Sequence, residues 1–350
     1  MDISPNNISE GTLLEDERFL RRIAHFYYEA GLTQENIAAT EHYSRQTISK
    51  ALQRAKDRGI IRISVVPEER TGYLRNLERD LRLKFGLEDL VLVPGRNLDE
   101  WPIETIAEGV LADVATNAAD YLDQLLKDTD ILAVTGGKHI MRHVVRYLKP
   151  TKRLPKLRIV STMGFVRTFT NFGDPNLIGH DIATAYGAMH AWLPIPAVVE
   201  TREQCEQARS LPLVRDVLKL MEDANLIIMG LWPSSENEYL VMRGIVTQEQ
   251  IDVIDSYKPV VDINHWVFDE LGICINNILS PPPYYLTGLE IPSLKDRIRN
   301  NGAKVILVAG ASKSYIPGIL AILRARIANI LITDHITAEL LNEQLPTERG

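Results

Sequence analysis

Residues 21–65 read RRIAHFYYEAGLTQENIAATEHYSRQTISKALQRAKDRGIIRISV, and this stretch decides the fold of the N-terminal part of the chain. Apolar residues at helical spacing predict a helix over residues 16–30, which Gly31 ends. Thr33 is a good N-cap for a short second helix over residues 34–40. The chain therefore begins with two predicted helices.

A third helix follows after a turn that contains no glycine. Ser44 caps this helix. Its inward-facing apolar residues are Ile48, Leu52 and Ala55. Because a tight turn needs a residue in a strained conformation that glycine adopts most easily, Glu41 or His42 must adopt it here. The segment at 60–66, IIRISVV, alternates like a short strand. Two short helices with a tight turn between them, the second polar and basic, are typical of a helix-turn-helix.

The third helix is basic, although the whole chain has a formal charge of −7. Between residues 44 and 62 there are six basic residues and a single acid, Asp57. A solvated helix face has the same charge pattern, but the order of the helices favours double-stranded operator DNA as a partner. Polar side chains on such a helix bind phosphates and base edges, and we expect those of the third helix to point outward. The expected DNA contacts are Thr33, Gln34, Ser44, Arg45, Gln46, Thr47, Ser49, Lys50 and Arg54.

The rest of the chain alternates helices with short apolar strands. Strands that end in glycine or another turn signal are predicted at 87–95, 131–137, 157–164, 226–232, 305–311 and 328–334. Helices are predicted at 101–126, 139–147 and 337–345. This order indicates a doubly wound α/β domain with a parallel sheet and helices on both faces. In such sheets ligands bind beyond the carboxyl ends of the strands, so the loops that follow the strands are the candidate sites.

The composition is that of a soluble globular chain with two domains. The chain has 350 residues, of which 45% are hydrophobic and 24% are charged, and this length exceeds one ordinary core. Two cysteines, Cys205 and Cys274, cannot form a disulfide framework and fit a reducing compartment. No apolar run reaches the roughly 18 residues of a membrane span, and the first residues lack a signal peptide. We therefore expect a cytoplasmic protein with no membrane partner.

The quoted stretch resembles the N-terminal domain of SorC-type (SorC/DeoR) bacterial transcription regulators. The matching residues are Tyr27-Tyr28, Gly31-Leu32-Thr33-Gln34, Ile37-Ala38, Ser44-Arg45-Gln46-Thr47 and Gly59-Ile60-Ile61. The resemblance extends over nearly the whole chain. It implies an effector domain that resembles sugar-phosphate isomerases, with a pocket for a sugar or sugar phosphate and with catalysis lost. It also implies self-association as a dimer or a tetramer.

Three motifs carry the resemblance in the second domain. They are Ala133-Val134-Thr135-Gly136-Gly137 with Lys138-His139, Val261-Asp262-Ile263, and Val308-Ala309-Gly310 with Lys313 and the later Leu331-Ile332-Thr333-Asp334. The resemblance implies that the first is a phosphate loop and that Asp262 holds sugar hydroxyls. Lys138 and His139 depart from the family, which commonly has hydroxyl residues there. The implied effector contacts are Gly136, Gly137, Lys138, His139, Gly164, Asp174, Arg243, Asp262 and Lys313.

The residues alone leave alternatives open for these contacts. Glycines at 136 and 137 let backbone N–H groups approach an oxyanion, but a strand followed by two glycines is also common as a plain turn. A solvated side chain is the alternative for Arg243, and a turn before a proline is the alternative for Asp174. His265 is expected to line the pocket or the core. His139 and His143 lie four residues apart without a third ligand nearby, so we expect no metal site.

These observations predict a helix-turn-helix domain over residues 1–66, a linker helix over 67–89 and an effector domain over 90–350. One stripe of the linker helix consists of Tyr73, Leu77, Leu81 and Phe85. This stripe suits either packing on its own domain or a contact between subunits.

The predicted function is that of a DNA-binding transcriptional regulator of a carbohydrate-utilisation operon, controlled by the effector. The alternative is an active sugar-phosphate isomerase-like enzyme with an accessory DNA-binding head. An isomerase needs an acid/base pair around a sugar carbon. Asp262 has no second carboxylate in a matching motif, so we predict no catalytic residue and no cofactor.

Overall fold

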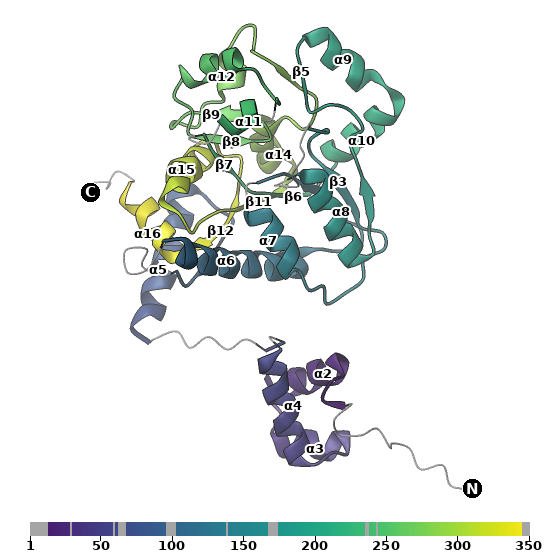
Figure 1. Ribbon diagram of the computed structural model, residues 1–350. Helices are drawn as coiled ribbons and strands as arrows, with labels where there is room; N and C mark the ends of the chain where they lie inside the picture. Colours follow the sequence, from purple (N-terminus) through teal and green to yellow (C-terminus); the bar gives the residue numbers. More distant parts are fainter. Residues whose placement is uncertain are drawn as a thin grey trace. The chain divides into compact units, whose positions relative to one another are not determined.

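The computed structural model describes residues 13–28, 30–58, 60–61, 68–95, 103–137, 139–166, 174–234, 238–242 and 244–344. The chain divides into two compact units, residues 1–71 and residues 72–350. The smaller unit has a hydrophobic core of its own, separate from the cores of the larger unit. Figure 1 shows the helical smaller unit and the mixed larger unit.

Three helices form the smaller unit, which we call the head. They are α2 (Glu17–Tyr28), α3 (Gln34–Glu41) and α4 (Arg45–Asp57). Their common core contains Phe19, Leu20, Ile23, Ile37, Ile48, Ala51, Leu52 and Ala55. The three predicted helices and the inward-facing residues of the third are therefore confirmed. Most of the predicted strand at 60–66 lies outside the described residues, but Ile60 and Ile61 pack against the head core.

The turn between α3 and α4 is closed by His42, which has a φ of 58°. Its backbone N–H donates to the carbonyl of Ala38 at the end of α3. Ser44 then begins α4, because its Oγ accepts the N–H of Thr47 at 3.0 Å. A histidine thus adopts the left-handed conformation that the absence of glycine in this turn required.

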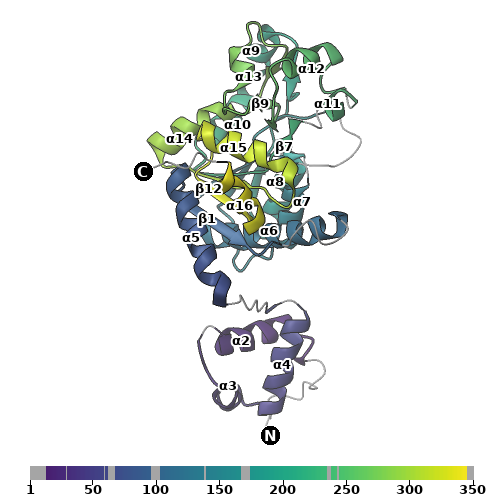
Figure 2. The same ribbon diagram turned by 90° about the vertical axis from the view of Figure 1, so that its left-hand side faces the viewer.

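Helix α5 (Glu68–Phe85) leads into the larger unit. Leu77 and Leu81 are buried in the core of that unit, whereas Tyr73 is 51% exposed. Figure 2 shows α5 beside β1 (Asp89–Val93) and α16 (His335–Glu343), and Lys84 Nζ donates to Asn342 Oδ1 at 2.7 Å. The middle of the predicted stripe therefore packs on its own domain, and a contact between subunits stays a prediction.

The larger unit is built on a seven-stranded sheet in the order β1-β12-β11-β6-β2-β3-β4. Every neighbouring pair in it is parallel. The strands after β1 are β2 (Ile131–Val134), β3 (Arg158–Ser161), β4 (Met189–Ala191), β6 (Leu226–Met229), β11 (Lys304–Val308) and β12 (Ile330–Asp334). The predicted doubly wound α/β fold with a parallel sheet is confirmed.

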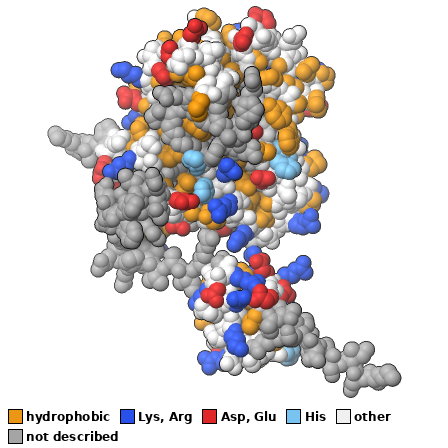
Figure 3. All heavy atoms as spheres, viewed as in Figure 1, with side chains coloured by type: hydrophobic (Ala, Val, Ile, Leu, Met, Phe, Trp, Pro, Cys, Tyr) orange, Lys and Arg blue, Asp and Glu red, His pale blue; other side chains and the backbone are white. Residues whose placement is uncertain are grey.

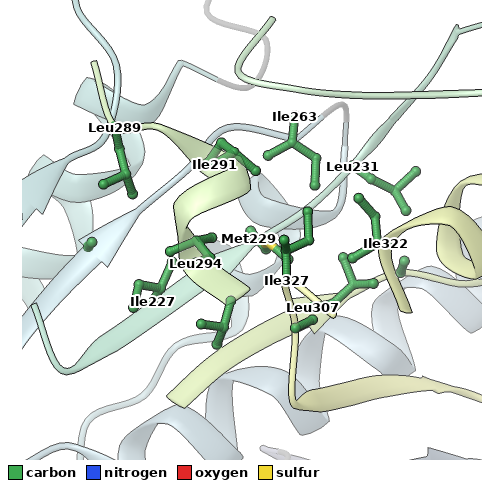
Figure 4. Packing of buried hydrophobic residues seen from close by; sticks show 14 of the residues in the cluster. Ile227, Met229, Leu231, Ile263, Leu289, Ile291, Leu294, Leu307, Ile322 and Ile327 are labelled. Carbon is green, nitrogen blue, oxygen red and sulfur yellow. The ribbon is translucent and has the colours of Figure 1, made fainter. Parts of the chain in front are cut away.

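Helices cover both faces of this sheet. Leu132 and Val134 of β2 belong to one core, together with α6 (Ile103–Leu125), α7 (Ile140–Tyr147) and α8 (Pro175–Tyr186). Ile131 and Ala133 belong to the opposite core, together with α10 (Pro212–Glu222), α14 (Leu294–Asn301) and α15 (Ile316–Ala325). Figure 4 shows strand residues such as Ile227, Met229 and Leu307 packed in this second core. Strands buried on both faces need continuous apolar sequences, as these are.

Small elements surround the carboxyl edge of the sheet. An antiparallel sheet joins β7 (Trp232–Pro233), β8 (Val261–Ile263) and β9 (Trp266–Phe268), and β5 (Val198–Val199) pairs with β10 (Tyr285–Leu286). The other helices among the described residues are α9 (Arg202–Ser210), α11 (Glu238–Met242), α12 (Gln248–Asp255) and α13 (Ile275–Ile278), with the 3-10 turns η2 (Ile291–Ser293) and η3 (Lys313–Tyr315). The segment at 261–263 is a motif of the sequence, but the sequence did not predict these small sheets.

The left-handed residue in the head makes its stability testable. His42→Gly should raise the free energy of opening of the head by about 0.5–1 kcal/mol, because glycine adopts this conformation without the penalty of a Cβ atom. Gly31→Ala is the matched opposite change, since Gly31 has a φ of 68° and no atom lies within 4 Å of the position that a Cβ would take; it should lower this free energy by a similar amount. Hydrogen exchange of the buried α4 amides in the full chain measures both. Equal protection in the two variants would contradict this account of the turn.

Candidate functional site

A pocket lies at the carboxyl ends of β2 and β6. Gly136 and Gly137 line it after β2, and Gly230 and Leu231 line it after β6. The strand order reverses here, since β3 lies beside β2 and β11 lies on the opposite side of β6. This is the switch point at which open α/β sheets bind ligands. The other lining residues are Met163, Val166, Asp174, Trp232, Leu240, Ile245, Asp262, Ile263, Asn264 and His265.

Two glycines from the neighbouring strands meet in this pocket. A Cβ atom on Gly137 would lie 3.0 Å from Gly230 Cα, and one on Gly230 would lie 3.1 Å from Gly137 Cα and 2.9 Å from a methyl group of Ile140. Gly137 also has a φ of 153°. Both positions therefore need glycine, one of them for its conformation as well.

The backbone N–H of Gly136 already has a partner within the protein. It donates to Asn264 Oδ1 at 3.2 Å, and Asn264 Nδ2 donates to Thr162 Oγ1 at 2.7 Å. Thr162 Oγ1 in turn donates to the carbonyl of Val134. Asn264 therefore occupies the Gly136 amide in the structure, and the role of this loop as an oxyanion site stays a prediction.

Asp262 and His265 lie together on the wall of the pocket. Asp262 is 5% exposed, and its Oδ1 accepts the backbone N–H of His265 at 2.7 Å. The carbonyl of His265 accepts from Asn276 Nδ2 at 3.2 Å and from the hydroxyl of Tyr284 at 2.9 Å. Burial raises the pKa of Tyr284, which keeps its hydroxyl protonated as the donor. His265 is therefore held firmly by its backbone.

Asp174 lines the pocket and begins α8. Its Oδ1 accepts the backbone N–H of Asn176 at 2.8 Å and the side-chain amide of Asn176 at 3.1 Å. Pro175 occupies the first turn of α8, where its missing N–H costs nothing. Asp174 therefore caps a helix before a proline and also lines the pocket, and its contact with an effector stays a prediction.

The structure brings together four of the nine predicted effector contacts, namely Gly136, Gly137, Asp174 and Asp262. Lys138 and Arg243 lie outside the described residues. Lys313 begins η3, is exposed and does not line this pocket. Gly164 does not line it either, and a Cβ there would lie 2.1 Å from the carbonyl of Ile195. The glycine at 164 thus serves close backbone packing.

His139 lines a different cavity, contrary to its predicted place beside the glycines. This second cavity lies between α7 and α8, and its other residues are Arg142, His143, Val145, Arg146, Leu177, Ile178 and Asp181. Burial and the nearby Arg146 lower the pKa of His143, so its ring is less readily protonated. The reason for the wrong prediction is that α7 begins at Ile140, directly after His139. His139 therefore lies with Arg142 and His143 of α7 at the second cavity, away from the pocket.

Several residues of the pocket were not predicted from the sequence. Gly230 ends a predicted strand, so the rule that placed the site at strand ends would have found it. Asn264 was also missed; it forms with His265 the two-residue connection between β8 and β9, which a search for hairpins after Asp262 would have found. His265 itself was expected to line the pocket or the core, and it lines the pocket. The apolar wall residues, such as Met163, Leu240 and Ile245, carry no sequence signal that separates them from the core.

The head presents the outer face of α4 to solvent. The side chains of Arg45, Gln46, Ser49, Lys50 and Arg54 are exposed as predicted, and so are Thr33 and Ser44, whereas Gln34 is half-buried. Thr47 is only 7% exposed, so its predicted outward position is wrong. The reason is that Ser44 is the N-cap of α4, and the hydroxyl of Thr47 lies 2.8 Å from the hydroxyl of Ser44.

Two arginines of α4 form ion pairs within the head. Arg45 Nε lies 2.8 Å from Glu35 Oε1, and Arg54 lies 2.5 Å from Glu15 Oε1. Figure 3 shows basic and acidic side chains intermixed on the head. The side chains of these pairs are largely exposed, and such surface pairs contribute only about 0–1 kcal/mol. A phosphate group can therefore compete with either glutamate for its arginine.

Two features are absent from the part of the chain that is described. None of its helices is long and apolar enough to cross a membrane. Within the same residues, no group of three or more His, Cys, Asp or Glu side chains is arranged to hold a metal ion.

Comparison with known proteins agrees with this architecture. The Sugar-bind family model, which describes a sugar-binding domain, matches residues 70–342. The chain belongs to this family. It is 25% identical over 335 residues to the deoxyribonucleoside regulator of Bacillus subtilis (strain 168), covering 95% of this chain and 99% of that protein. It is 27% identical over 342 residues to the transcriptional regulator LsrR of Escherichia coli (strain K12), covering 97% of this chain and 98% of that protein.

A solved structure of a related regulator has the same fold. The full-length sorbitol operon regulator SorC from Klebsiella pneumoniae matches with a TM-score of 0.68 and 22% identity, covering 93% of this chain and 98% of that chain. The predicted relationship to SorC-type regulators is therefore confirmed. The relatives match the head as well as the Sugar-bind domain, since their alignments span almost the whole chain.

The contact between the two glycines gives a test of the pocket. Gly230→Ala should lower the free energy of unfolding by about 1–3 kcal/mol, because the new methyl group overlaps Ile140 and the backbone of Gly137. Gly109→Ala on α6 is the control, since no atom lies within 4 Å of a Cβ there. That change should raise stability by up to about 1 kcal/mol through helix propensity. Urea denaturation of the full chain measures both, and a Gly230→Ala variant as stable as the parent contradicts the tight contact.

Proposed function

We propose that this Sugar-bind protein is a DNA-binding transcriptional regulator of a carbohydrate-utilisation operon, and that a sugar or sugar phosphate controls it. The observation that carries the proposal is a pocket at the switch point of a Sugar-bind sheet, in a chain that also has a helix-turn-helix head. The relatives named as a sorbitol operon regulator and a deoxyribonucleoside regulator support it. A gel shift on DNA upstream of the chain's own gene, with and without candidate sugars, tests it.

The head supports operator recognition through α4. In helix-turn-helix proteins the second helix of the motif enters the major groove, and its N-terminal residues contact base edges. Gln46 and Ser49 are exposed near the start of α4, and Arg45 and Lys50 are exposed beside them. Glutamine and arginine can each form two hydrogen bonds with a base, whereas lysine suits a phosphate. Thr47 is proposed to stabilise the start of the helix instead of contacting DNA.

The pocket supports a hydroxyl-rich effector. Its described wall combines apolar side chains with the carboxylates of Asp174 and Asp262 and the ring of His265, and these described lining residues include no lysine or arginine. Carboxylates accept hydrogen bonds from sugar hydroxyls. The proposed grip on a phosphate group depends on Lys138 and Arg243 and on the loop after β2.

We propose a non-enzymatic role for the pocket. An isomerase needs an acid and a base that are ready to exchange protons with a sugar carbon. Asp174 and Asp262 each accept a backbone N–H, which ties one oxygen of each carboxylate to the fold. An assay of the purified chain on common aldose and ketose phosphates tests this assignment, and turnover would support the isomerase alternative.

Substitutions on α4 should separate base contacts from phosphate contacts. Gln46→Ala should cost about 1–3 kcal/mol of binding at one operator position, because a base edge loses its partner. Lys50→Ala should weaken binding to all DNA sequences and reduce the slope of log K against log salt by about 1. Gln53→Ala, a change of an exposed residue further along α4 that bonds Asp57, is the control. Operator binding by Gln46→Ala that matches the parent at every position would show that α4 is not the reading helix.

The chain is proposed to act as a dimer or a tetramer. One helix-turn-helix reads only a few base pairs, so useful specificity requires two heads on half-sites one or more helical turns apart. Sedimentation of the full chain at micromolar concentration should give at least a dimer. A monomer that persists when operator DNA is added contradicts this.

A further inference from the structure

The hairpin between β8 and β9 has an unusual residue in its turn. Ile263 pairs with Trp266, so the connection consists of Asn264 and His265 alone. Both have positive φ angles, 54° and 68°. Two-residue hairpin turns of this kind favour asparagine followed by glycine, because the second residue must also be left-handed. His265 therefore occupies a position where the backbone favours a residue without a side chain.

The backbone of His265 has all its hydrogen bonds. Its N–H donates to Asp262 Oδ1, and its carbonyl accepts from Asn276 and Tyr284, which are both buried. These three bonds fix the direction in which the side chain leaves the turn. A ring held in this way loses little freedom when it binds a ligand.

The ring of His265 differs from its backbone. Its side chain is 9% exposed, and within the described part of the chain neither Nδ1 nor Nε2 has a hydrogen-bond partner, although Nδ1 lies 3.5 Å from Asp262 Oδ2. Buried polar side chains are normally hydrogen-bonded, so a ring in a ligand pocket that has only this long contact with Asp262 indicates a missing partner. The neighbouring Asn264 provides a contrast, because its side-chain oxygen and nitrogen both have partners. Strained residues that persist in a fold are concentrated at functional sites.

We propose that His265 contacts the effector and that, with Asp262, it recognises two adjacent hydroxyl groups. This inference rests on the proposed function, in which the effector occupies this pocket. Nδ1 of His265 lies 3.5 Å from Asp262 Oδ2, and both residues line the pocket. A neutral imidazole offers one donor and one acceptor, and a carboxylate offers acceptors, so the pair complements hydroxyls on neighbouring carbons.

A metal ion is a poorer candidate for this pair. The described residues place no third His, Cys, Asp or Glu ligand with Asp262 and His265. The pocket wall around them is largely apolar, with Leu231, Leu240 and Ile245 among its residues. A few polar groups in an apolar wall are the usual composition of a site for a small organic ligand.

The test compares His265→Gly and His265→Asn with the parent. Glycine removes the ring and suits the left-handed backbone, so the fold should be retained. Asparagine also tolerates this backbone and keeps one donor and one acceptor. The control is His143→Ala, since Nδ1 of His143 is also buried without a hydrogen bond to any residue that the structure describes, but lies at the second cavity.

The probes are D-glucose 6-phosphate, D-sorbitol 6-phosphate, D-ribose 5-phosphate and 2-deoxy-D-ribose 5-phosphate, whose furanose ring has no two adjacent hydroxyls. Affinities for the full chain are measured by calorimetry, and unfolding midpoints are measured in parallel. We expect at least one probe with adjacent hydroxyls to bind the parent. We expect His265→Gly to weaken that probe on the order of tenfold, with an unfolding midpoint no lower than that of the parent. His265→Asn should have an intermediate affinity, and His143→Ala should match the parent.

Three results would overturn the inference. The first is that the parent and His265→Gly bind the probe with equal affinity. The second is that His265→Gly loses as much affinity for a 2-deoxy probe that lacks the adjacent pair. The third is that no probe binds the parent. The proposed function is judged separately by the gel shift of the parent on operator DNA. A parent that binds operator DNA and responds to a probe, together with a His265→Gly variant of unchanged affinity, would leave the regulator proposal intact and reject the role of His265.

Discussion

The contact between Gly137 and Gly230 is the constraint on which the pocket depends. These glycines end neighbouring strands at the point where the chain turns to opposite sides of the sheet, and neither leaves room for a Cβ atom. Because the two backbones touch, part of the pocket lining is main chain with no side chain to fill the space. Asn264 of the β8–β9 hairpin accepts the N–H of Gly136, next to these glycines.

A short chain of hydrogen bonds connects the parts around these glycines. It runs from Gly136 through Asn264 and Thr162 to Val134, and so it links the hairpin to β2 and to the segment after β3. Each bond in it is partly or fully buried, and buried bonds are costly to break singly because the partner is left unsatisfied. The backbone that carries the pocket side chains therefore has its hydrogen bonds, whereas the ring of His265 has no hydrogen bond to any described residue.

The sequence predicted those features of the fold that depend on patterns along the chain. Continuous apolar segments followed by glycine located every strand of the parallel sheet except β4, which is short and not fully buried. Apolar spacing and the capping residues Thr33 and Ser44 located the helices of the head. It did not predict that His139 would be carried away from Gly137 by the start of α7, or that Thr47 would turn inward. Both depend on the exact residue at which a helix begins, which fixes the direction of every side chain after it. The apolar pocket wall was also missed, since burial in a pocket and burial in a core select the same residue types.

The packing of helix α5 limits where the head of one such protein can be joined to the larger unit of another. Leu77 and Leu81 are part of the core beneath the sheet, although they precede the first strand in sequence. A protein begun after this helix would expose that apolar surface to water and would tend to aggregate. An exchange of DNA-binding heads between related genes would leave the sugar-binding body intact only when the joint falls before Leu77. The evolutionary unit of the body is thus longer than its sheet, and it carries its own connecting helix.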